Sequence, residues 1–422
     1  MTGHSKLQQG MVLGMSTFAF TVCFMIWMMF AILGVPIKEL LSLNETQFGL
    51  LVATPVLTGS LIRLPLGMLT DKFGGRIVFF VLMMVCVMPI YFISHATLYW
   101  HFLVLGLFVG LAGGSFSVGI AYVAKWFEKK NQGFAMGIFG AGNAGAAVTK
   151  FVAPAIIAAS SWQMVPKVYS AIMFITALLF WFLTTEDKSH RVSTSVTMRD
   201  QLLALKDPRV WRYCQYYSIV FGGYVALSLW MTKYYVNEYG FNLQTAALLA
   251  AAFSLPGGIL RAIGGWMSDK WGAHSVTWWV MWVSWICLFI LSYPQTDFTI
   301  TTVNGPQTFH IGLNAYVFTA LLFVMGVAFA FGKASVFKYI SNEYPDNMGV
   351  ISGIVGLAGG LGGFVLPIMF GALVDITGIR SSAFMLLYGV VWVSLIWMYL
   401  SEVRKIPMMG EGSTNPMPAS DN

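Results

Sequence analysis

Twelve apolar runs, each long enough to cross a bilayer as a helix, occupy most of this 422-residue chain. A membrane helix needs about 17–25 mostly apolar residues to cross the hydrocarbon layer. The segment must be helical because that layer offers no partners to unpaired backbone groups. The runs cover residues 11–34, 47–70, 77–94, 102–124, 133–158, 168–183, 214–231, 246–267, 276–291, 311–340, 350–373 and 383–400. With 57% hydrophobic and only 10% charged residues, the composition excludes a water-soluble globule and predicts an all-α membrane protein of twelve transmembrane helices.

Basic residues outside the apolar runs are divided unevenly between the two sets of loops. Fifteen Lys and Arg fall on the side of the N-terminus and only four on the opposite side. Because cytoplasmic loops carry the excess of Lys and Arg, we expect both termini in the cytoplasm. The chain is thus expected to be a multi-pass protein of the cytoplasmic (inner) membrane, surrounded by lipid. Its net charge of +7 follows from this bias, and no soluble basic domain is left to bind nucleic acid.

One short string occurs twice, 198 residues apart, and each copy has an arginine within an apolar run, Arg63 in the first and Arg261 in the second. A charged side chain at the centre of a membrane helix costs about 2.5–3.5 kcal/mol on insertion scales, and a guanidinium cannot lose its proton there. A second pair of strings, 132–140 and 348–356, is 216 residues apart. These repeats predict two pseudo-symmetric six-helix bundles that share one anionic ligand between them.

The expected bundles comprise residues 1–184 and 210–401. A polar, basic and Ser/Thr-rich segment, 185–209, is the expected cytoplasmic linker, and residues 402–422 are expected to form a disordered cytoplasmic tail. The glycine string 140–145 matches a dinucleotide fingerprint, but it lies inside an apolar run rather than after a strand. We expect no cofactor, no metal and a monomeric protein.

Several motifs resemble a known family of transporters. Both arginine strings end in Gly-x-x-x-Asp-x-x-Gly, which is similar to the cytoplasmic loop signature of the major facilitator superfamily. The glycine-rich strings 137–145 and 356–363 resemble the two nitrate signatures of the nitrate/nitrite porter family within that superfamily, and the resemblance extends over residues 18–400. It implies the major facilitator fold and a secondary active transporter that imports nitrate by alternating access.

The resemblance also implies the residues of the site. Arg63 and Arg261 match the substrate-clamping arginines of the family, and Asn143 matches its helix-five asparagine. The other implied substrate-binding residues are the aromatic Phe30, Phe116, Tyr217 and Phe221 and the glycines Gly142, Gly145, Gly359 and Gly360. The implied conformational loops contain Gly67, Asp71, Gly74 and Arg76 in the first half and Gly265, Asp269 and Gly272 in the second.

The chemistry of the two arginines suits nitrate, which is planar and singly charged. A guanidinium is also planar, and its forked donors can bind two oxygens in one plane. One arginine from each half could hold an edge of the anion while aromatic rings cover its faces. A larger or tetrahedral anion would fit badly.

Proton coupling is expected to depend on buried lysines, since every Asp and Glu lies near a helix end or in a loop. Lys150 is seven residues after Asn143, on about the same helix face, and Lys333 lies in the tenth apolar run. Our hypothesis is that Lys150 releases its proton when the site is empty and is charged when an anion is bound. The residues around Lys150 and the short linker resemble the symporter-type branch of the family.

Other functions remain open at this point. They are nitrate/nitrite antiport, exchange of small carboxylates such as oxalate or formate, and an anion receptor that moves nothing. An enzyme is not expected, because the apolar runs contain no acid/base pair, nucleophile constellation or metal-ligand spacing.

Overall fold

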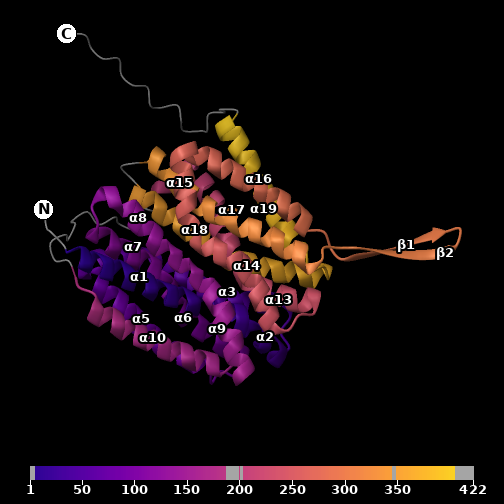
Figure 1. The fold of residues 1–422 in the computed structure, drawn as a ribbon, viewed down its shortest axis with the longest axis horizontal. Coiled ribbons are helices and arrows are strands. Elements are labelled where there is room, and N and C mark those ends of the chain that lie inside the picture. The colour runs from indigo at the N-terminus through magenta and orange to yellow at the C-terminus, as the bar shows by residue number, and fades with distance from the viewer. Residues whose placement is uncertain (1–4, 187–198, 200–202, 345–347, 404–422) are drawn as a thin grey trace, which may run out of the picture.

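The computed structural model describes residues 5–186, 199, 203–344 and 348–403. They form two groups of long helices that lie side by side, one from each half of the chain (Figure 1). The first half contains α1 Lys6–Trp27, α2 Phe30–Leu41, α3 Glu45–Leu61, α4 Arg63–Phe73, α5 Gly75–Ile93, α6 Tyr99–Val109, α7 Ser115–Trp126, α8 Lys129–Gly140, α9 Gly145–Ala159 and α10 Met164–Leu183. The second half contains α12 Pro208–Tyr217, α13 Tyr224–Tyr239, α14 Leu243–Ile259, α15 Arg261–Trp271, α16 Ala273–Leu291, α17 Ala315–Glu343, α18 Met348–Thr377 and α19 Ser382–Met398.

Helices lie at the positions of all twelve predicted membrane crossings. Within the described residues, nine helices are long and apolar enough to cross a membrane, or eleven if each of two bent pairs is one span. The remaining predicted crossing, 214–231, falls on α12 and α13, which are joined by a π-helical segment, Ser218–Gly223. The predicted linker lies mostly outside the described residues, and the predicted tail lies outside them from residue 404 onward.

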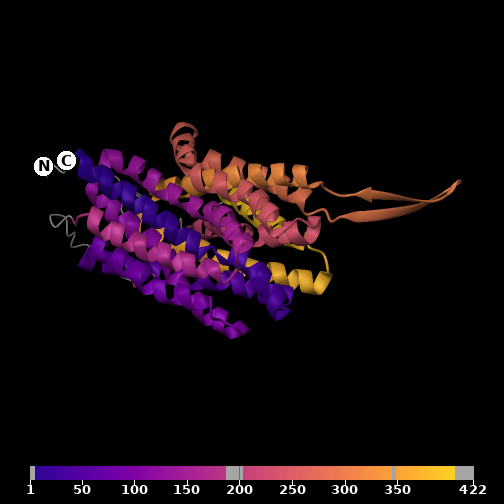
Figure 2. The same ribbon diagram turned by 60° about the horizontal axis from the view of Figure 1, so that its bottom comes forward.

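A β-hairpin interrupts the otherwise helical fold of the described residues. Strand β1 (Thr296–Thr302) pairs with β2 (Gly305–Ile311), so the helix predicted to begin at residue 311 begins at Ala315 instead. The hairpin projects away from the helices, at the end of the molecule opposite the start of α1 (Figures 1 and 2). We call this end the hairpin face and the opposite end the N-terminal face. The hairpin is signalled in the sequence by alternating Thr, Phe and Ile residues before its turn, Val303-Asn304, which is followed by Gly305 with a positive φ of 105°.

The two arginine strings form bent helices. Between α3 and α4 the axis turns by 41°, and between α14 and α15 by 49°, so that Arg63 and Arg261 each begin the second segment. In the first pair Pro65 has no N–H to offer the carbonyl of Leu61, which breaks the hydrogen-bond ladder at the bend. In the second pair Gly257-Gly258, which has low helix propensity, immediately precedes the bend.

The two halves touch most extensively where α3 packs against α18 and where α14 packs against α9. Glycines allow the first contact: a Cβ atom at Gly49 would lie 2.2 Å from the carbonyl oxygen of Pro367, and one at Gly371 would lie 2.2 Å from that of Glu45. Small residues are the usual means by which membrane helices approach closely. The contact between α3 and α18 therefore depends on glycine at these two positions.

We expect Gly49→Ala to destabilise the protein by about 1–3 kcal/mol, the usual cost of overpacking a close contact, because α3 and α18 must separate to admit a methyl group. The measurement is thermal unfolding in detergent. Gly389→Ala is the matched control, since a Cβ atom there meets nothing within 4 Å. Equal melting temperatures for the two variants would contradict this account of the contact.

Candidate functional site

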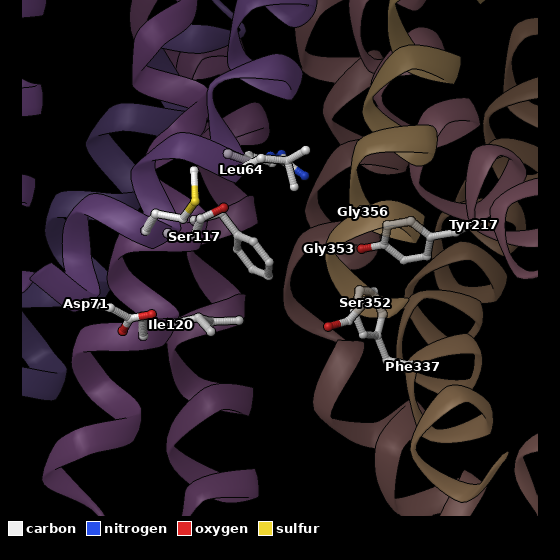
Figure 3. Close-up of a pocket in the computed structure, with 14 residues that line it drawn as sticks. Leu64, Asp71, Ser117, Ile120, Tyr217, Phe337, Ser352, Gly353 and Gly356 are labelled. Atoms are coloured by element: carbon white, nitrogen blue, oxygen red, sulfur yellow. The ribbon is translucent and has the colours of Figure 1, made fainter. Parts of the chain in front are cut away.

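A cavity of about 310 Å³ lies between the two halves. In Figure 3, Leu64, Ser117 and Ile120 line it from one half, and Tyr217 and Gly356 face them from the other. Asp71, which follows the first bend toward the N-terminal face, lies at one end of the lining. The cavity thus reaches toward the N-terminal face, whereas the halves are in close contact on the hairpin face.

Both arginines contact the same aromatic ring. The guanidinium carbons of Arg63 and Arg261 each lie 5.6 Å from the centre of the Phe116 ring. Arg63 also lies 5.1 Å from the ring of Phe221, and Arg261 lies 5.5 Å from that of Phe337. Attraction to aromatic faces partly compensates a buried cation. The structure therefore brings the two sequence-predicted arginines together, one from each half, with aromatic rings around them.

Two buried donors of the first half lack a hydrogen-bond partner in the described part of the chain, one on Arg63, which lines the cavity, and one on Asn143, which does not. Arg63 is 8% exposed and Asn143 is 1% exposed. The Nε atom of Arg63 and the Nδ2 atom of Asn143 have no hydrogen-bond partner among the described residues. A buried polar group without a partner costs about 1–3 kcal/mol, and more when it is charged. Such donors are suited to a ligand that supplies acceptor oxygens.

The aromatic lining is built around Tyr217, which lines the cavity. Its ring stacks on that of Phe221, with ring centres 5.3 Å apart, and meets the edge of Phe337 at 4.8 Å. Phe337 was missed in the sequence, although it lies one helical turn after Lys333 and so on the same face of α17. Trp27 was also missed as a site residue; its ring lies 5.8 Å from the guanidinium of Arg63, and its Nε1 donates to the carbonyl of Pro55.

Phe30 and the four predicted glycines do not line this cavity. Phe30 is fully buried and packs near Gly106 of α6. At each of the four glycines, an added Cβ atom would be too close to a neighbouring residue. The neighbours are Phe20 at Gly142, the carbonyl of Thr21 at Gly145, the ring of Tyr217 at Gly359 and the hydroxyl of Ser60 at Gly360. These glycines act here as packing positions. Only Gly359 is next to a cavity residue, since its absent side chain leaves room for Tyr217.

The two lysines contact α14 from different helices, Lys150 from α9 and Lys333 from α17. The ammonium of Lys150 donates to the hydroxyl of Ser254 and approaches the carbonyl of Ala146 at 3.4 Å. The ammonium of Lys333 donates to the carbonyl of Gly257 at 2.6 Å and lies 3.6 Å from the centre of the Tyr224 ring. Both lysines are at most 1% exposed.

Tyr224 joins these two lysine environments to each other and to the other half. Its hydroxyl lies 2.8 Å from the carbonyl of Ser254 and 3.3 Å from that of Asn143. Lys150 and Asn143 belong to the first half, whereas Ser254 and Tyr224 belong to the second. Lys150 therefore takes part in a buried polar network that crosses the boundary between the halves.

The predicted conformational loops make ion pairs within their own halves. Asp71 pairs with Lys125 at 3.5 Å, and Asp269 pairs with Lys338 at 2.7 Å. Gly74 and Gly272 have positive φ angles of 95° and 86°, which favour glycine at both turns. The remaining loop glycines, Gly67 and Gly265, have open space where a Cβ atom would lie.

Arg76 follows the first loop and is held within the first half. Its guanidinium donates to the carbonyl of Trp181 at 2.5 Å and lies 4.0 Å from the centre of that ring. Its backbone N–H donates to the carboxylate of Glu186 at 2.8 Å. Burial is the main cause that raises the pKa of Glu186 above its ordinary value.

Comparison with known proteins gives concordant results. The family described as Major Facilitator Superfamily matches residues 15–367. The chain is 39% identical to a protein of Thermus thermophilus named probable nitrate/nitrite antiporter NarK1, over 93% of this chain and 91% of the relative. It is 31% identical to the nitrite extrusion protein of Bacillus subtilis, over 94% and 96%, and 31% identical to the probable nitrate transporter NarT of Staphylococcus carnosus, over 93% and 97%.

A solved structure supports the fold alone. A bacterial homologue of the human lysosomal transporter Spinster, in an inward-facing and occupied conformation, superposes with a TM-score of 0.72. The match covers 96% of this chain and 98% of that one, at 14% sequence identity. The major facilitator fold is thereby confirmed, and the family is one of transporters rather than enzymes. The chain belongs to the major facilitator superfamily and, within it, to the NarK-like nitrate/nitrite porters.

Proposed function

We propose that this protein imports nitrate across the cytoplasmic membrane by alternating access, with one proton carried alongside each anion. The N-terminal face is assigned to the cytoplasm, because fifteen Lys and Arg residues are predicted from the sequence to lie in loops on the side of the N-terminus. The cavity is then open to the cytoplasm in this conformation. The observation that carries the proposal is the pair of arginines, one from each half, 5.6 Å from the same Phe116 ring.

An anion is the ligand that this arrangement favours. Two guanidinium groups close to each other in a low-dielectric cavity repel when it is empty, and a bound anion offsets that repulsion. The unpartnered Nε of Arg63 and Nδ2 of Asn143 supply donors in addition to charge. A planar anion suits these groups, since its oxygens accept hydrogen bonds at the edge while aromatic rings such as Phe116 cover its face.

The identity of the anion is inferred from the relatives together with this chemistry. The three relatives named above are called a nitrate/nitrite antiporter, a nitrite extrusion protein and a nitrate transporter. Nitrate and nitrite are both small and flat, with a single negative charge. Nitrate is the proposed principal substrate, with nitrite as a second substrate of the same site.

Proton symport is proposed because of Lys150. Within the described residues, its ammonium contacts the hydroxyl of Ser254 and the carbonyl of Ala146, both neutral groups, and makes no ion pair with a carboxylate. A buried cation without a counter-ion is unfavourable, and an anion bound between the halves would reduce that cost. Since Ser254 belongs to the other half, a change of charge on Lys150 would act directly on the contact between the halves.

Nitrate/nitrite antiport is the second candidate. The relative from Thermus thermophilus is named as an antiporter, and it is more similar to this chain than the relatives from Bacillus subtilis and Staphylococcus carnosus. In an antiporter the arginine pair alone suffices, because the anion that returns offsets the charge. The two candidates make opposite predictions for the role of Lys150.

We expect Arg63→Lys to reduce nitrate uptake into proteoliposomes by about 10- to 100-fold, since a charge-assisted hydrogen bond contributes about 1.5–3 kcal/mol and lysine cannot form the second one. Arg209→Lys is the matched control, because Arg209 pairs with Asp207 outside the cavity. Uptake by Arg63→Lys at the rate of the control would contradict the clamp. An excess of formate that competes as well as nitrite does would indicate a carboxylate exchanger instead.

For Lys150→Met, we expect nitrate uptake to lose its response to an imposed pH gradient while binding of nitrate persists. Uptake is measured in proteoliposomes with the pH gradient and the internal nitrite varied independently. Lys167→Met is the control, because Lys167 is exposed at the start of α10. A variant still driven by the pH gradient would eliminate Lys150 as the proton carrier, and an unsubstituted protein driven only by internal nitrite would establish antiport.

A further inference from the structure

The hairpin face is closed by a contact in which one half caps a helix of the other. The carboxylate of Asp375, near the end of α18, accepts hydrogen bonds from the backbone N–H groups of Glu45 and Thr46 at 3.1 and 2.8 Å. It also accepts from the hydroxyl of Thr46 at 2.6 Å. The next N–H group, that of Gln47, is capped within its own half by Asn44. The first turn of α3 therefore depends on both halves for its hydrogen bonds.

A carboxylate is well suited to this position. The first turn of a helix carries a partial positive charge, and a negative group placed there gains from both the charge and the N–H donors. Because Asp375 belongs to the second half and α3 to the first, this interaction exists only while the hairpin face is closed. Opening that face would leave these N–H groups and this carboxylate, which is already exposed to solvent, without each other as partners.

An ion pair reinforces the same contact. Lys233 of α13 pairs with Glu45 of α3, and Lys38 lies 3.3 Å from the other oxygen of that carboxylate. The Lys233 side chain is largely buried, and its ammonium lies 4.2 Å from the Trp230 ring and 4.9 Å from the Phe48 ring. A buried pair of this kind is costly to break by removing one partner, since the other is left as an uncompensated charge.

This contact acts on the helix that leads to the cavity. The helix α3 runs from Glu45 to the bend before Arg63, so its two ends lie at the hairpin face and at the proposed anion site. This capping carboxylate has no counterpart in the first half of the internal repeat. The position 216 residues before Asp375 is Ala159, which has no carboxylate. At that end of the symmetry-related helix α14, Asn242 of its own half caps the N–H of Thr245.

We propose that Asp375, Glu45 and Lys233 form the gate of the hairpin face, which holds this face closed while the cavity is open to the N-terminal face. In this role they position the halves and do not touch the substrate. The gate must break and reform once in every transport cycle. This inference rests on contacts between the halves and holds whichever anion the cavity accepts.

The test is a pair of distance measurements by pulsed electron paramagnetic resonance without added anion. Spin labels are attached to the full-length protein after its four cysteines have been replaced. Leu40→Cys and Tyr316→Cys report on the hairpin face, one from each half, and Phe73→Cys and Trp271→Cys report on the N-terminal face. In Asp375→Ala and in Lys233→Met we expect the ratio of hairpin-open to hairpin-closed molecules to rise by about tenfold.

A gate also predicts a reciprocal change. As the distance on the hairpin face lengthens, the distance on the N-terminal face should shorten, and Asp375→Glu should restore both distributions. Asp297→Ala is the matched control, because Asp297 pairs with His310 on the hairpin and lies outside the contact between the halves. Unchanged distributions in both gate variants, or disorder on both faces without reciprocity, would overturn the proposal. Failure of nitrate uptake alone would instead count against the proposed substrate.

Discussion

Two permanent positive charges at the boundary between the halves impose the main constraint on this molecule. Arg63 and Arg261 share Phe116 as a neighbour, and neither guanidinium can discharge by losing a proton. Their mutual repulsion must be offset by aromatic rings, by water or by an anion. The proposed function follows from this requirement, because the protein gains most when an anion occupies the place where the two charges converge.

Bent helices connect the place where the two arginines lie to the two faces of the protein. A single bent helix carries Arg63 at its bend and Glu45 at its far end, so the anion site and the closed face belong to one structural element. The buried network around Lys150 and Ser254 joins the halves at the other main contact, between α9 and α14. The two contacts differ chemically. Between α3 and α18 a carboxylate caps a helix end, whereas between α9 and α14 an amine donates a hydrogen bond to a hydroxyl.

Local sequence patterns predicted the helices and the arginine pair, because hydropathy and internal repeats are properties of the chain itself. The hairpin was missed, although alternating Thr, Phe and Ile residues precede its turn, because a short amphipathic ribbon does not stand out in hydropathy. Asp375 could not be recognised, because its role depends on partners far away in the sequence, whereas Phe337 was signalled only by its position one helical turn after Lys333. The glycines were predicted as ligand surface, but a small residue has the same appearance in sequence whether a ligand or a ring such as Phe20 approaches it.

The hairpin extends well beyond the helices on the face that the gate closes (Figure 2). Its strands are hydrogen-bonded to each other, and Val303 at its turn is fully exposed. A small ion can diffuse past such a ribbon without hindrance, whereas a large macromolecule that approaches along this direction meets the ribbon before it reaches the helix ends. The first part of the protein that such a macromolecule would meet on this side is therefore the hairpin and not the helix ends.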